Sequence, residues 1–594
     1  MAVLSRLAPG RWHPLALVLL LVGCPIAVLH AVSGTPDGFS AYYNLAWAEG
    51  FDAAFWGGDA YPRRLDTLVD GTGGLDFFFY GPAPFWLNST IGRLLCGGCS
   101  ATAAFPLTGA LLIVLSGAAF YPFARCFAGR RAAALGAGAY MLLPYHMLAD
   151  WWLRQAVGEI AAFVFIPLVA LGMKRILDRQ PGFVLFTLSL AGLVLSHLPS
   201  TMVMAYFLAA YGAVRAWQAR GALATLIRPV ARLAGAGALG LALSAIYWLP
   251  AISLLGDVSP DLLYTAYGDP LNWLFLDGRA APNTMTAEWT GTLYLAALAV
   301  AVAAYVALKD GHPARLDWVL GPIAFGLFMT SVLAAPIWAH TPIAAIQFPW
   351  RTLMVVDLGV ALAITGLADQ FLAPRTPLSA ALLRRTRLAA LTVAVALCVA
   401  TVLILPTITR AADNAHRGDQ APIPTGALEY IPAPFLTKVR EAVDALPDPA
   451  PGTSPYRHWH EGIRTAADDL RAASADSAAL TVLDRTGTRQ INIRAEREKF
   501  GEIVLPYPHW QHWQAINTAT GEPIPLLVHE DTGGMVINGG PGPIDLRVVL
   551  AVTPAERLGG WLSGLSALLL LAMAIRSFVT RWPVRTAPLR SEPA

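Results

Sequence analysis

The stretch HPLALVLLLVGCPIAVLHAV, residues 13–32, decides the fold class of this chain. It runs for about 20 residues without a charged side chain, the length that an α-helix needs to cross the hydrocarbon core of a bilayer. It is too long and too apolar for a typical cleaved signal peptide, so we expect a signal anchor. The whole composition agrees, because 56% of the residues are hydrophobic, 14% are charged and the mean hydropathy is +0.52.

Similar apolar runs recur along the chain and predict a polytopic α-helical membrane protein. We expect about 12 transmembrane helices, at residues 13–32, 101–122, 132–149, 159–176, 183–198, 199–216, 233–253, 291–308, 318–337, 352–371, 389–408 and 558–577. The runs divide the chain into a transmembrane domain at 1–408, a soluble domain at 409–556, and a final helix with a tail at 557–594.

The positions of Lys and Arg predict the orientation of the chain. If the N-terminus is cytoplasmic, every inner loop carries basic residues, as the positive-inside rule requires. The short outer loops carry few arginines, namely Arg63, Arg64, Arg93, Arg154, Arg279 and Arg351. We therefore expect both termini in the cytoplasm. The net charge of +3 reflects this bias and does not indicate nucleic-acid binding.

Two polar regions are expected on the outer side, the loop 33–100 and the domain 409–556. In the second region, short runs of alternating apolar residues are separated by Gly and Pro, which predicts a small β-sandwich. The clearest runs are 479–483, 490–493, 502–505 and 545–550, and helices are expected before them at 433–446 and 461–474.

Five cysteines are too few for a disulfide scaffold. Cys96 and Cys99 lie in the outer loop, where an oxidising compartment favours a local disulfide. A redox or zinc role is the alternative, although neither a βαβ pattern nor a second pair of ligands accompanies them. Pairs of histidines at 458/460 and 509/512 have metal-compatible spacing, but each pair lies among aromatic residues.

Charged residues at outer turns are the candidates for chemistry. Asp150, Arg154 and Glu159 stand close together in the turn between two spans, where buried charge is costly unless it is paired or functional. One reading is an ion pair between Arg154 and either acid that joins two helix ends. The other places Arg154 on a lipid phosphate, because a guanidinium matches phosphate geometry.

Arg351, in Gln347-Phe348-Pro349-Trp350-Arg351, opens another span on the outer side, against the charge rule. It is either an interfacial anchor or a second contact to an anionic ligand. Asp357, deeper in the same span, is expected to be a structural polar contact. His197, at the turn between two spans, is either a hydrogen-bonded turn residue or a ligand contact.

Asp37, in Gly34-Thr35-Pro36-Asp37-Gly38, follows the first span directly. A carboxylate at the membrane surface, followed by a loop too polar to span, suits the processing of a lipid-linked substrate. The aromatic segment 39–56 that follows is expected to be an interfacial helix over the site.

Several motifs resemble those of the bacterial membrane proteins named for a "6-pyruvoyl-tetrahydropterin synthase-related" domain. They are 59–63 (DAYPR), 78–82 (FFYGP), 144–159 from Pro-Tyr to Glu, 196–198 (SHL), 245–250 (AIYWLP), 347–351 (QFPWR), 429–432 (EYIP) and 505–510 (LPYPHW). The pterin name does not carry over in chemistry, because pterin synthases are soluble and use a three-histidine zinc site.

That family in turn resembles the GT-C superfamily of glycosyltransferases, which take a sugar from a polyprenyl-phosphate donor. The resemblance implies a bacterial inner-membrane protein with a periplasmic soluble domain, and a catalytic acid in the first outer loop, which Asp37 matches. It implies a second acid in the next loop, for which both Asp150 and Glu159 are candidates. Arg64 and Gly81 depart from the family, which often has a bulky aromatic residue and a second proline at these two positions, and the departures concern acceptor contacts more than the overall fold.

The resemblance implies an inverting sugar transfer to an envelope glycan, lipid or protein, and the residues are compatible with that chemistry. Such a transfer needs a base for the acceptor hydroxyl and cations for the phosphate leaving group. Asp37 is the candidate base and Arg154 with Arg351 the phosphate clamp; further candidate contacts are His197, Arg63 and Tyr145. A divalent Mg²⁺ or Mn²⁺ ion at Asp37 is left open.

Two other functions fit the same sequence. Many spans with buried charges also describe a transporter or flippase for a lipid-linked substrate. A non-catalytic scaffold for envelope assembly, with the β-rich domain binding a partner, is the third possibility.

Overall fold

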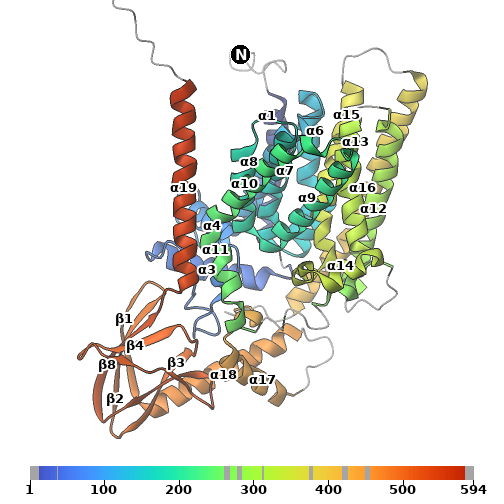
Figure 1. The fold of residues 1–594 in the computed structure, drawn as a ribbon. Helices are drawn as coiled ribbons and strands as arrows, with labels where there is room; N and C mark the ends of the chain where they lie inside the picture. Colours follow the sequence, from blue (N-terminus) through green and yellow to red (C-terminus); the bar gives the residue numbers. More distant parts are fainter. Residues whose placement is uncertain are drawn as a thin grey trace, which may run out of the picture.

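The structure is a computed structural model. It describes residues 13–36, 38–259, 262, 268–276, 284–310, 313–372, 379–417, 426–447 and 455–581. Asp37 therefore lies outside the described residues. A bundle of helices and a β-rich C-terminal region make up the described chain (Figure 1).

Each apolar run of the sequence falls on one or more helices. The first is α1 (Pro14–Val18), η2 (Leu19–Gly23) and α2 (Cys24–Ser33). The others are α5 (Ala101–Ala124), α6 (Arg130–Leu142), α7 (Val157–Leu177), α8 (Phe183–Ser196), α9 (Leu198–Gln218), α10 (Ile227–Leu243), α11 (Ala245–Ser253), α12 (Thr284–Leu308), α13 (Pro313–Thr330), α15 (Leu353–Leu372), α16 (Ala380–Arg417) and α19 (Pro554–Arg581).

In the described part of the chain, eight helices are long and apolar enough to cross a membrane. A ninth is added if α10 and α11, which meet at a bend of 77°, count as one span. The chain is thus a multi-pass membrane protein by length and composition, while the expected total of twelve spans stays a prediction.

Burial divides the helices into inner and peripheral ones. In the span that contains α15, 89% of the residues in the most apolar stretch are buried. The helix α15 packs against α6, α12 and α13. In the first span and in α19 only 17% is buried, so their leucines face outward, as expected of helices that contact lipid. Figure 1 shows α19 running beside the bundle, where it packs against α10 and α11.

The β-rich region contains two sheets that share one core. The five-stranded sheet has the order β1-β2-β8-β4-β5 and the three-stranded sheet the order β3-β7-β6. Ile491, Ile493 and Val548 of the first sheet pack with Ile503 and Ile537 of the second. The strands are β1 (Ala479–Thr486), β2 (Gln490–Arg497), β3 (Gly501–Pro508), β4 (Trp513–Asn517), β5 (Pro523–Ile524), β6 (Leu527–Val528), β7 (Gly534–Gly539) and β8 (Gly542–Leu550).

The alternating runs read from the sequence thus fall on β1, β2, β3 and β8. Two helices precede the strands, α17 (Ala433–Ala445) and α18 (Pro455–Ser477), close to the expected ranges. The apolar faces of these helices pack against the first loop rather than only against the sheets, because Phe435 and Leu470 share a core with Trp47 and Phe77.

The first loop folds between the bundle and the sheets (Figure 1). It contains α3 (Ala41–Trp56), η3 (Asp76–Phe78) and α4 (Ala83–Leu94). Its polar groups bind the C-terminal region directly: Asp70 Oδ2 lies 2.7 Å from Arg471 Nη2, and Asp76 Oδ1 accepts a hydrogen bond of 2.7 Å from the backbone N–H of Ala427. The loop is therefore held as a layer between the two larger parts.

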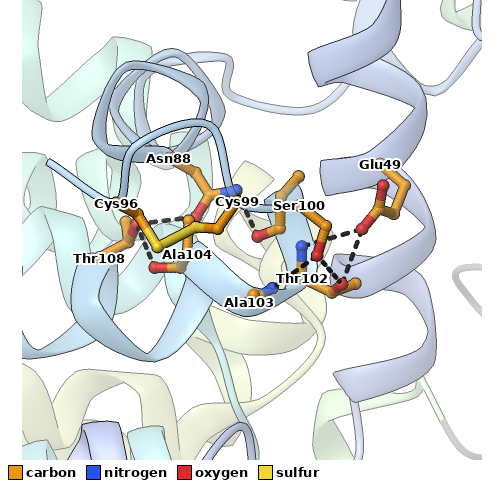
Figure 2. Close-up of a disulfide and its surroundings, with 10 residues drawn as sticks. Glu49, Asn88, Cys96, Cys99, Ser100, Thr102, Ala103, Ala104 and Thr108 are labelled. Carbon is orange, nitrogen blue, oxygen red and sulfur yellow. Dashed lines mark hydrogen bonds between the residues drawn. A yellow bond between two sulfur atoms is a disulfide. The ribbon is translucent and has the colours of Figure 1, made fainter. Parts of the chain in front are cut away.

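A disulfide between Cys96 and Cys99 closes the turn that joins α4 to α5 (Figure 2). The backbone of Gly97 and Gly98 in that turn has positive φ values, +66° and +88°, which glycine adopts without strain. On the other side of the turn, Glu49 of α3 accepts hydrogen bonds from the backbone and hydroxyl of Thr102 (Figure 2). Both contacts fix the N-terminus of α5.

Candidate functional site

The candidate site is built on an unusual helix, the π-helix η4 (Pro144–Leu153), which lies between α6 and α7. Pro144 cannot donate a backbone hydrogen bond, so it begins the helix, and the widened turn brings Tyr145 and Asp150 to the same side as Arg154. π-Helical turns are rare and often occur at functional sites. The sequence does not reveal this geometry, because its apolar pattern is that of an ordinary span.

Arg154 is the centre of a buried polar cluster. Its Nη1 donates to Asp150 Oδ1, to Glu159 Oε2 at 3.0 Å and to the hydroxyl of Tyr145 at 3.3 Å. Tyr145 in turn donates to Glu159 Oε1 at 2.5 Å. These contacts join η4 to the first turn of α7 and match the ion-pair reading of the sequence. Because all three use Nη1, the other guanidinium nitrogens have no hydrogen bond to this cluster.

Arg351 enters the same cluster from the start of a distant helix. It lies in η11 (Pro349–Thr352), directly before α15, and its Nε is 3.9 Å from Glu159 Oε2. Its Nη1 donates to the carbonyl of Ile346 at 2.6 Å. The Nε atom is buried and has no hydrogen-bond partner among the described residues. Arg351 is therefore held near an acid without being fully paired.

Gly158 allows two more side chains to approach. A Cβ atom at Gly158 would lie 3.0 Å from Cδ2 of His197 and 3.1 Å from the hydroxyl of Tyr80. His197 Nδ1 is 2.6 Å from the hydroxyl of Ser200 and accepts from the backbone N–H of Ser200, so it caps α9. His197 thus lies beside the cluster while serving as a turn residue. Tyr80 was not singled out from the sequence as a site residue.

The backbone that follows Asp37 lies against the cluster. Phe39 N–H donates to the carbonyl of Leu153 at 3.1 Å, and Ser40 N–H donates to the carbonyl of Arg154 at 2.9 Å. A Cβ atom at Gly38 would lie 2.8 Å from the carbonyl carbon of Arg154, so only glycine fits there. The described start of the first loop and the Arg154 turn are therefore neighbours.

Arg63 lies in a different cluster. Its Nε is 2.9 Å from Glu556 Oε1 at the start of α19, and its Nη2 donates to the carbonyl of Ile246 in α11 at 2.6 Å. Arg489 of the β-rich region also binds Glu556. Arg63 therefore joins the first loop to α11 and α19, and the structure does not bring it together with Arg154.

Two buried amides near Arg154 were not assigned a role from the sequence. Gln155 has a positive φ of +52°, and neither Nε2 nor Oε1 of its side chain has a hydrogen-bond partner among the described residues. Asn44 of α3 donates through Nδ2 to the Gln155 carbonyl, while its Oδ1 has no partner in the same part of the chain. A positive φ and an unpaired amide are not visible in a sequence.

A buried acid lies further out, in the first loop. Asp76 Oδ1 accepts from Trp47 Nε1 at 3.0 Å and from the backbone of Ala427. Burial raises the pKa of Asp76 to about 7, and the neighbouring Glu429 adds to the rise, whereas the two hydrogen bonds oppose it. Burial also raises the pKa of Glu429. These acids belong to the junction between the loop and the C-terminal region.

No set of three or more His, Cys, Asp or Glu side chains suited to a metal ion is found in the described ranges. The donor groups of the cluster, two acids already bound by Arg154, do not form such a set. The divalent ion considered from the sequence was placed at Asp37, which lies outside the described residues, and no chemical step is derived through it.

No protein-family model and no curated protein matches the chain. Among solved structures, it is similar to the arabinofuranosyltransferase AftD from Mycobacteria, with 16% identity, a TM-score of 0.43, and 88% of this chain and 40% of AftD covered. It is also similar to an Archaeoglobus fulgidus oligosaccharyltransferase tethered with an acceptor peptide, with 15% identity and a TM-score of 0.39. That match covers 76% of this chain and 63% of the oligosaccharyltransferase. A third similar structure is ArnT from Cupriavidus metallidurans bound to undecaprenyl phosphate, with 13% identity and a TM-score of 0.38. That match covers 88% of this chain and 97% of ArnT.

The chain thus spans less than two thirds of the first two of these proteins. All three TM-scores are below 0.5 and all identities are below 25%. At these values the likeness carries no conclusion about activity, and the family resemblance seen in the motifs stays a prediction.

Proposed function

We propose that this chain is an integral membrane glycosyltransferase that moves a sugar from a polyprenyl-phosphate donor to an envelope acceptor at the outer face of the inner membrane. The observation that carries the proposal is the buried Nε of Arg351, which has no hydrogen-bond partner in the described chain although Glu159 Oε2 lies 3.9 Å away. A buried, under-paired guanidinium is costly and marks a place for an anion.

The phosphate clamp is assigned to Arg154 and Arg351. Both guanidinium groups approach one oxygen, Glu159 Oε2, at 3.0 and 3.9 Å. A phosphate bound beside Glu159 is then reached by Nε of Arg351 and by nitrogens of Arg154 other than Nη1. Guanidinium groups bind phosphate oxygens through charge-assisted hydrogen bonds, which stabilise the leaving group as its charge develops.

The acids have different roles in this proposal. Both oxygens of Glu159 are engaged, one by Tyr145 and one by Arg154, so Glu159 orients the arginines. Asp150 keeps Oδ2 free of hydrogen bonds within the described chain, which favours Asp150 over Glu159 as the second acid. Asp37, assigned from the sequence alone, is the general base.

The proposed reaction is a single displacement. The acceptor hydroxyl oxygen forms a bond to the anomeric carbon of the sugar while the bond from that carbon to the phosphate oxygen breaks. Asp37 takes the proton of the hydroxyl, and the leaving polyprenyl phosphate keeps the electron pair and is held by the two arginines. The products are a glycosylated acceptor and free polyprenyl phosphate.

The test is turnover by the purified full chain in detergent. Polyprenyl phosphates carrying a hexose or a pentose are supplied with envelope glycan, lipid and protein acceptors, and free polyprenyl phosphate is measured. We expect release that depends on an acceptor, and Arg351→Gln should abolish it. Arg93→Gln is the control, because Arg93 is an exposed outer arginine that lies over Trp56. Release that is equal in the wild type and in Arg351→Gln contradicts the proposal.

One observation favours transport as the second candidate. The helices α10 and α11 meet at a bend of 77°, and broken helices are typical of transporters. No second bent pair is found in the described ranges, whereas a transporter built from repeats has matched pairs. Intact sugar lipid that crosses a liposome membrane without bond cleavage would support transport, and neither turnover nor transport would leave the scaffold function.

A further inference from the structure

Gln155 combines three features that a structural glutamine rarely shares. Its backbone is left-handed, its side chain is 0% exposed, and both atoms of its amide lack a hydrogen-bond partner among the described residues. A left-handed backbone is strained for a residue other than glycine, and strain of this kind is concentrated at functional sites. An unpaired buried amide adds a second cost, since both its donor and its acceptor have been removed from water.

The position of Gln155 is fixed by its backbone. The carbonyl accepts hydrogen bonds from Asn44 Nδ2 and from the backbone N–H of Val157 at 3.0 Å. A Cβ atom on Gly38 would lie 3.0 Å from the Cβ of Gln155, so the start of the first loop also packs against it. The backbone and the Cβ of Gln155 are therefore held in place by contacts that do not use its amide.

Asn44 completes the arrangement. It is buried, and its Oδ1 has no hydrogen-bond partner in the described chain. Together, Gln155 and Asn44 offer one NH₂ donor and two acceptor oxygens, beside the residue that carries the proposed phosphate contact. Another buried amide is paired at both of its polar atoms: Asn88 Nδ2 donates to the carbonyl of Ala101 at 3.0 Å, and its Oδ1 accepts from Thr108 at 2.7 Å.

The unpaired atoms select the chemistry of a ligand. A deprotonated phosphate offers only acceptors, so it can use the NH₂ group of Gln155 but cannot satisfy the two amide oxygens. A hydrocarbon chain satisfies neither. Hydroxyl groups both donate and accept, so a ligand with several neighbouring hydroxyls satisfies the donor and the acceptors together.

We propose that Gln155, with Asn44, binds hydroxyl groups of the sugar that the lipid phosphate carries. This inference rests on the proposed function, because it takes the phosphate at Arg154 and Arg351 as the neighbouring group. Gln155 is then a specificity-determining contact for the sugar ring, carried by the residue that directly follows Arg154 in the chain.

The experiment compares three ligands on the purified full chain in detergent, with affinity measured from ligand-dependent thermal unfolding. The ligands are polyprenyl phosphate, polyprenyl-phosphate-linked hexoses and pentoses, and a polyprenyl-phosphate tetrahydropyran that has the ring without the hydroxyls. Two or three neutral hydrogen bonds predict that at least one hydroxylated donor binds the wild type roughly 10- to 100-fold more tightly than the bare ring.

Gln155→Met keeps the length of the side chain and removes the amide. It should reduce the preference for the hydroxylated ring to less than about threefold while the affinity for polyprenyl phosphate alone stays within about twofold. Its unfolding temperature should equal or exceed that of the wild type, because two unpaired buried groups are lost. If Gln155→Met does not fold, Gln155→Gly, which accepts the positive φ, replaces it.

Asn88→Leu is the matched control. It removes a buried amide that is fully paired, so the unfolding temperature should fall while the preference for the hydroxylated ring persists. If the Gln155 variant keeps the preference for the hydroxylated ring, the inference is overturned. A wild type without any preference overturns it as well. Either result indicates that water or packing alone accommodates the Gln155 amide. A wild type that does not bind polyprenyl phosphate overturns the proposed function itself.

Discussion

Arg351 and Glu159 form a loose ion pair at the junction of two helices. Nε of Arg351 lies 3.9 Å from Glu159 Oε2, which is too long for a hydrogen bond, whereas Arg154 holds the same oxygen at 3.0 Å. The Arg351 side chain is 14% exposed and that of Glu159 is 0% exposed. Of the two arginines that approach Glu159, Arg351 makes the longer contact, and its side chain is more exposed than that of Glu159. Arg351 is therefore the group most ready to bind a second anion.

Replacing Arg351 with Lys should weaken the binding of polyprenyl phosphate. Lysine keeps the charge but loses the planar fork, and one lost charge-assisted hydrogen bond corresponds to an affinity decrease of roughly 10- to 100-fold. Titration of the purified protein with polyprenyl phosphate measures the change. Folding should remain close to normal, because Glu159 keeps its contacts with Arg154 and Tyr145.

Arg93→Lys is the control for this experiment, since Arg93 is an exposed arginine of the first loop, away from the cluster of Arg154 and Arg351. Its affinity for polyprenyl phosphate should match that of the wild type. If Arg351→Lys and Arg154→Lys both fail to fold, the cluster is a structural ion-pair network, and the phosphate clamp is wrong.

Glu159→Gln should destabilise the protein strongly. The substitution keeps the shape but leaves the buried Arg154 with one acid partner, Asp150, instead of two. Removing one partner of a buried ion pair costs about 3 kcal/mol of unfolding free energy or more. Thermal unfolding of the detergent-purified variant measures the loss.

Glu49→Gln is the matched comparison. Glu49 accepts its hydrogen bonds from Thr102 at an exposed site, so its loss should cost no more than about 1 kcal/mol. Equal effects of the two substitutions would show that the charge of Glu159 is not needed in the cluster.

Asp76→Asn should remove a pH dependence from the stability. Burial raises the pKa of Asp76 in the folded state to about 7, above an unfolded value of about 3.9. The folded state therefore holds more protons between these values, and stability falls as pH rises through about 4 to 7. The whole difference between the folded and unfolded pKa values corresponds to a loss of about 4 kcal/mol of unfolding free energy once the pH is above about 7.

The asparagine keeps an acceptor oxygen for Trp47 and Ala427, so the variant should be more stable than the wild type at pH 8 and less sensitive to pH between 5 and 8. Glu429, whose pKa is also raised, contributes a residual dependence of the same sign. Asp444→Asn, at an exposed position of α17, serves as the control. A wild type whose unfolding temperature rises over this pH range would refute the assignment.

The periodicity of the sequence predicted the positions of the helices and strands well, but it did not predict the irregular turns and bends between helices. Residues 490–493 and 545–550 fall on strands because the alternation of buried and less buried side chains is local to each strand. The π-helix around Asp150 and the bend between Leu243 and Ala245 were not predicted, since tertiary packing decides both geometries.

The site shows the same division. The charge rule marked Arg154 and Arg351 as unusual outer residues, and the structure brings both to Glu159. The sequence also grouped Arg63 with them, but residues distant in sequence, Ile246 and Glu556, hold it elsewhere. Gln155 was not recognised, because only its backbone angle and its missing partners distinguish it from an ordinary polar residue in a turn.

The disulfide predicts the accessibility of the cysteines. Cys24, Cys126 and Cys398 are free and exposed, whereas Cys96 and Cys99 are bonded to each other. Protein denatured without reductant should therefore label with a thiol reagent at three of its five cysteines, and at all five after reduction. Mass spectrometry of the labelled peptides identifies the sites. Labelling of Cys96 or Cys99 before reduction would contradict the disulfide.

Asp37→Asn should separate binding from catalysis. The substitution keeps the size of the side chain but removes its basicity, so polyprenyl-phosphate sugars should bind with unchanged affinity while turnover falls. A general base typically contributes a factor of about 10²–10⁴ to the rate. Release of free polyprenyl phosphate by the purified protein measures turnover, and thermal unfolding in the presence of the donor measures binding.

Asp52→Asn is the control, because Asp52 is another acid of the same loop, in the C-terminal half of α3. Turnover of this variant should equal that of the wild type. If Asp37→Asn turns over normally while Asp150→Asn does not, the base belongs to η4 instead, where Asp150 keeps Oδ2 unpaired within the described chain. If both variants turn over normally, the reaction needs neither carboxylate, and the proposed displacement with an aspartate base is wrong.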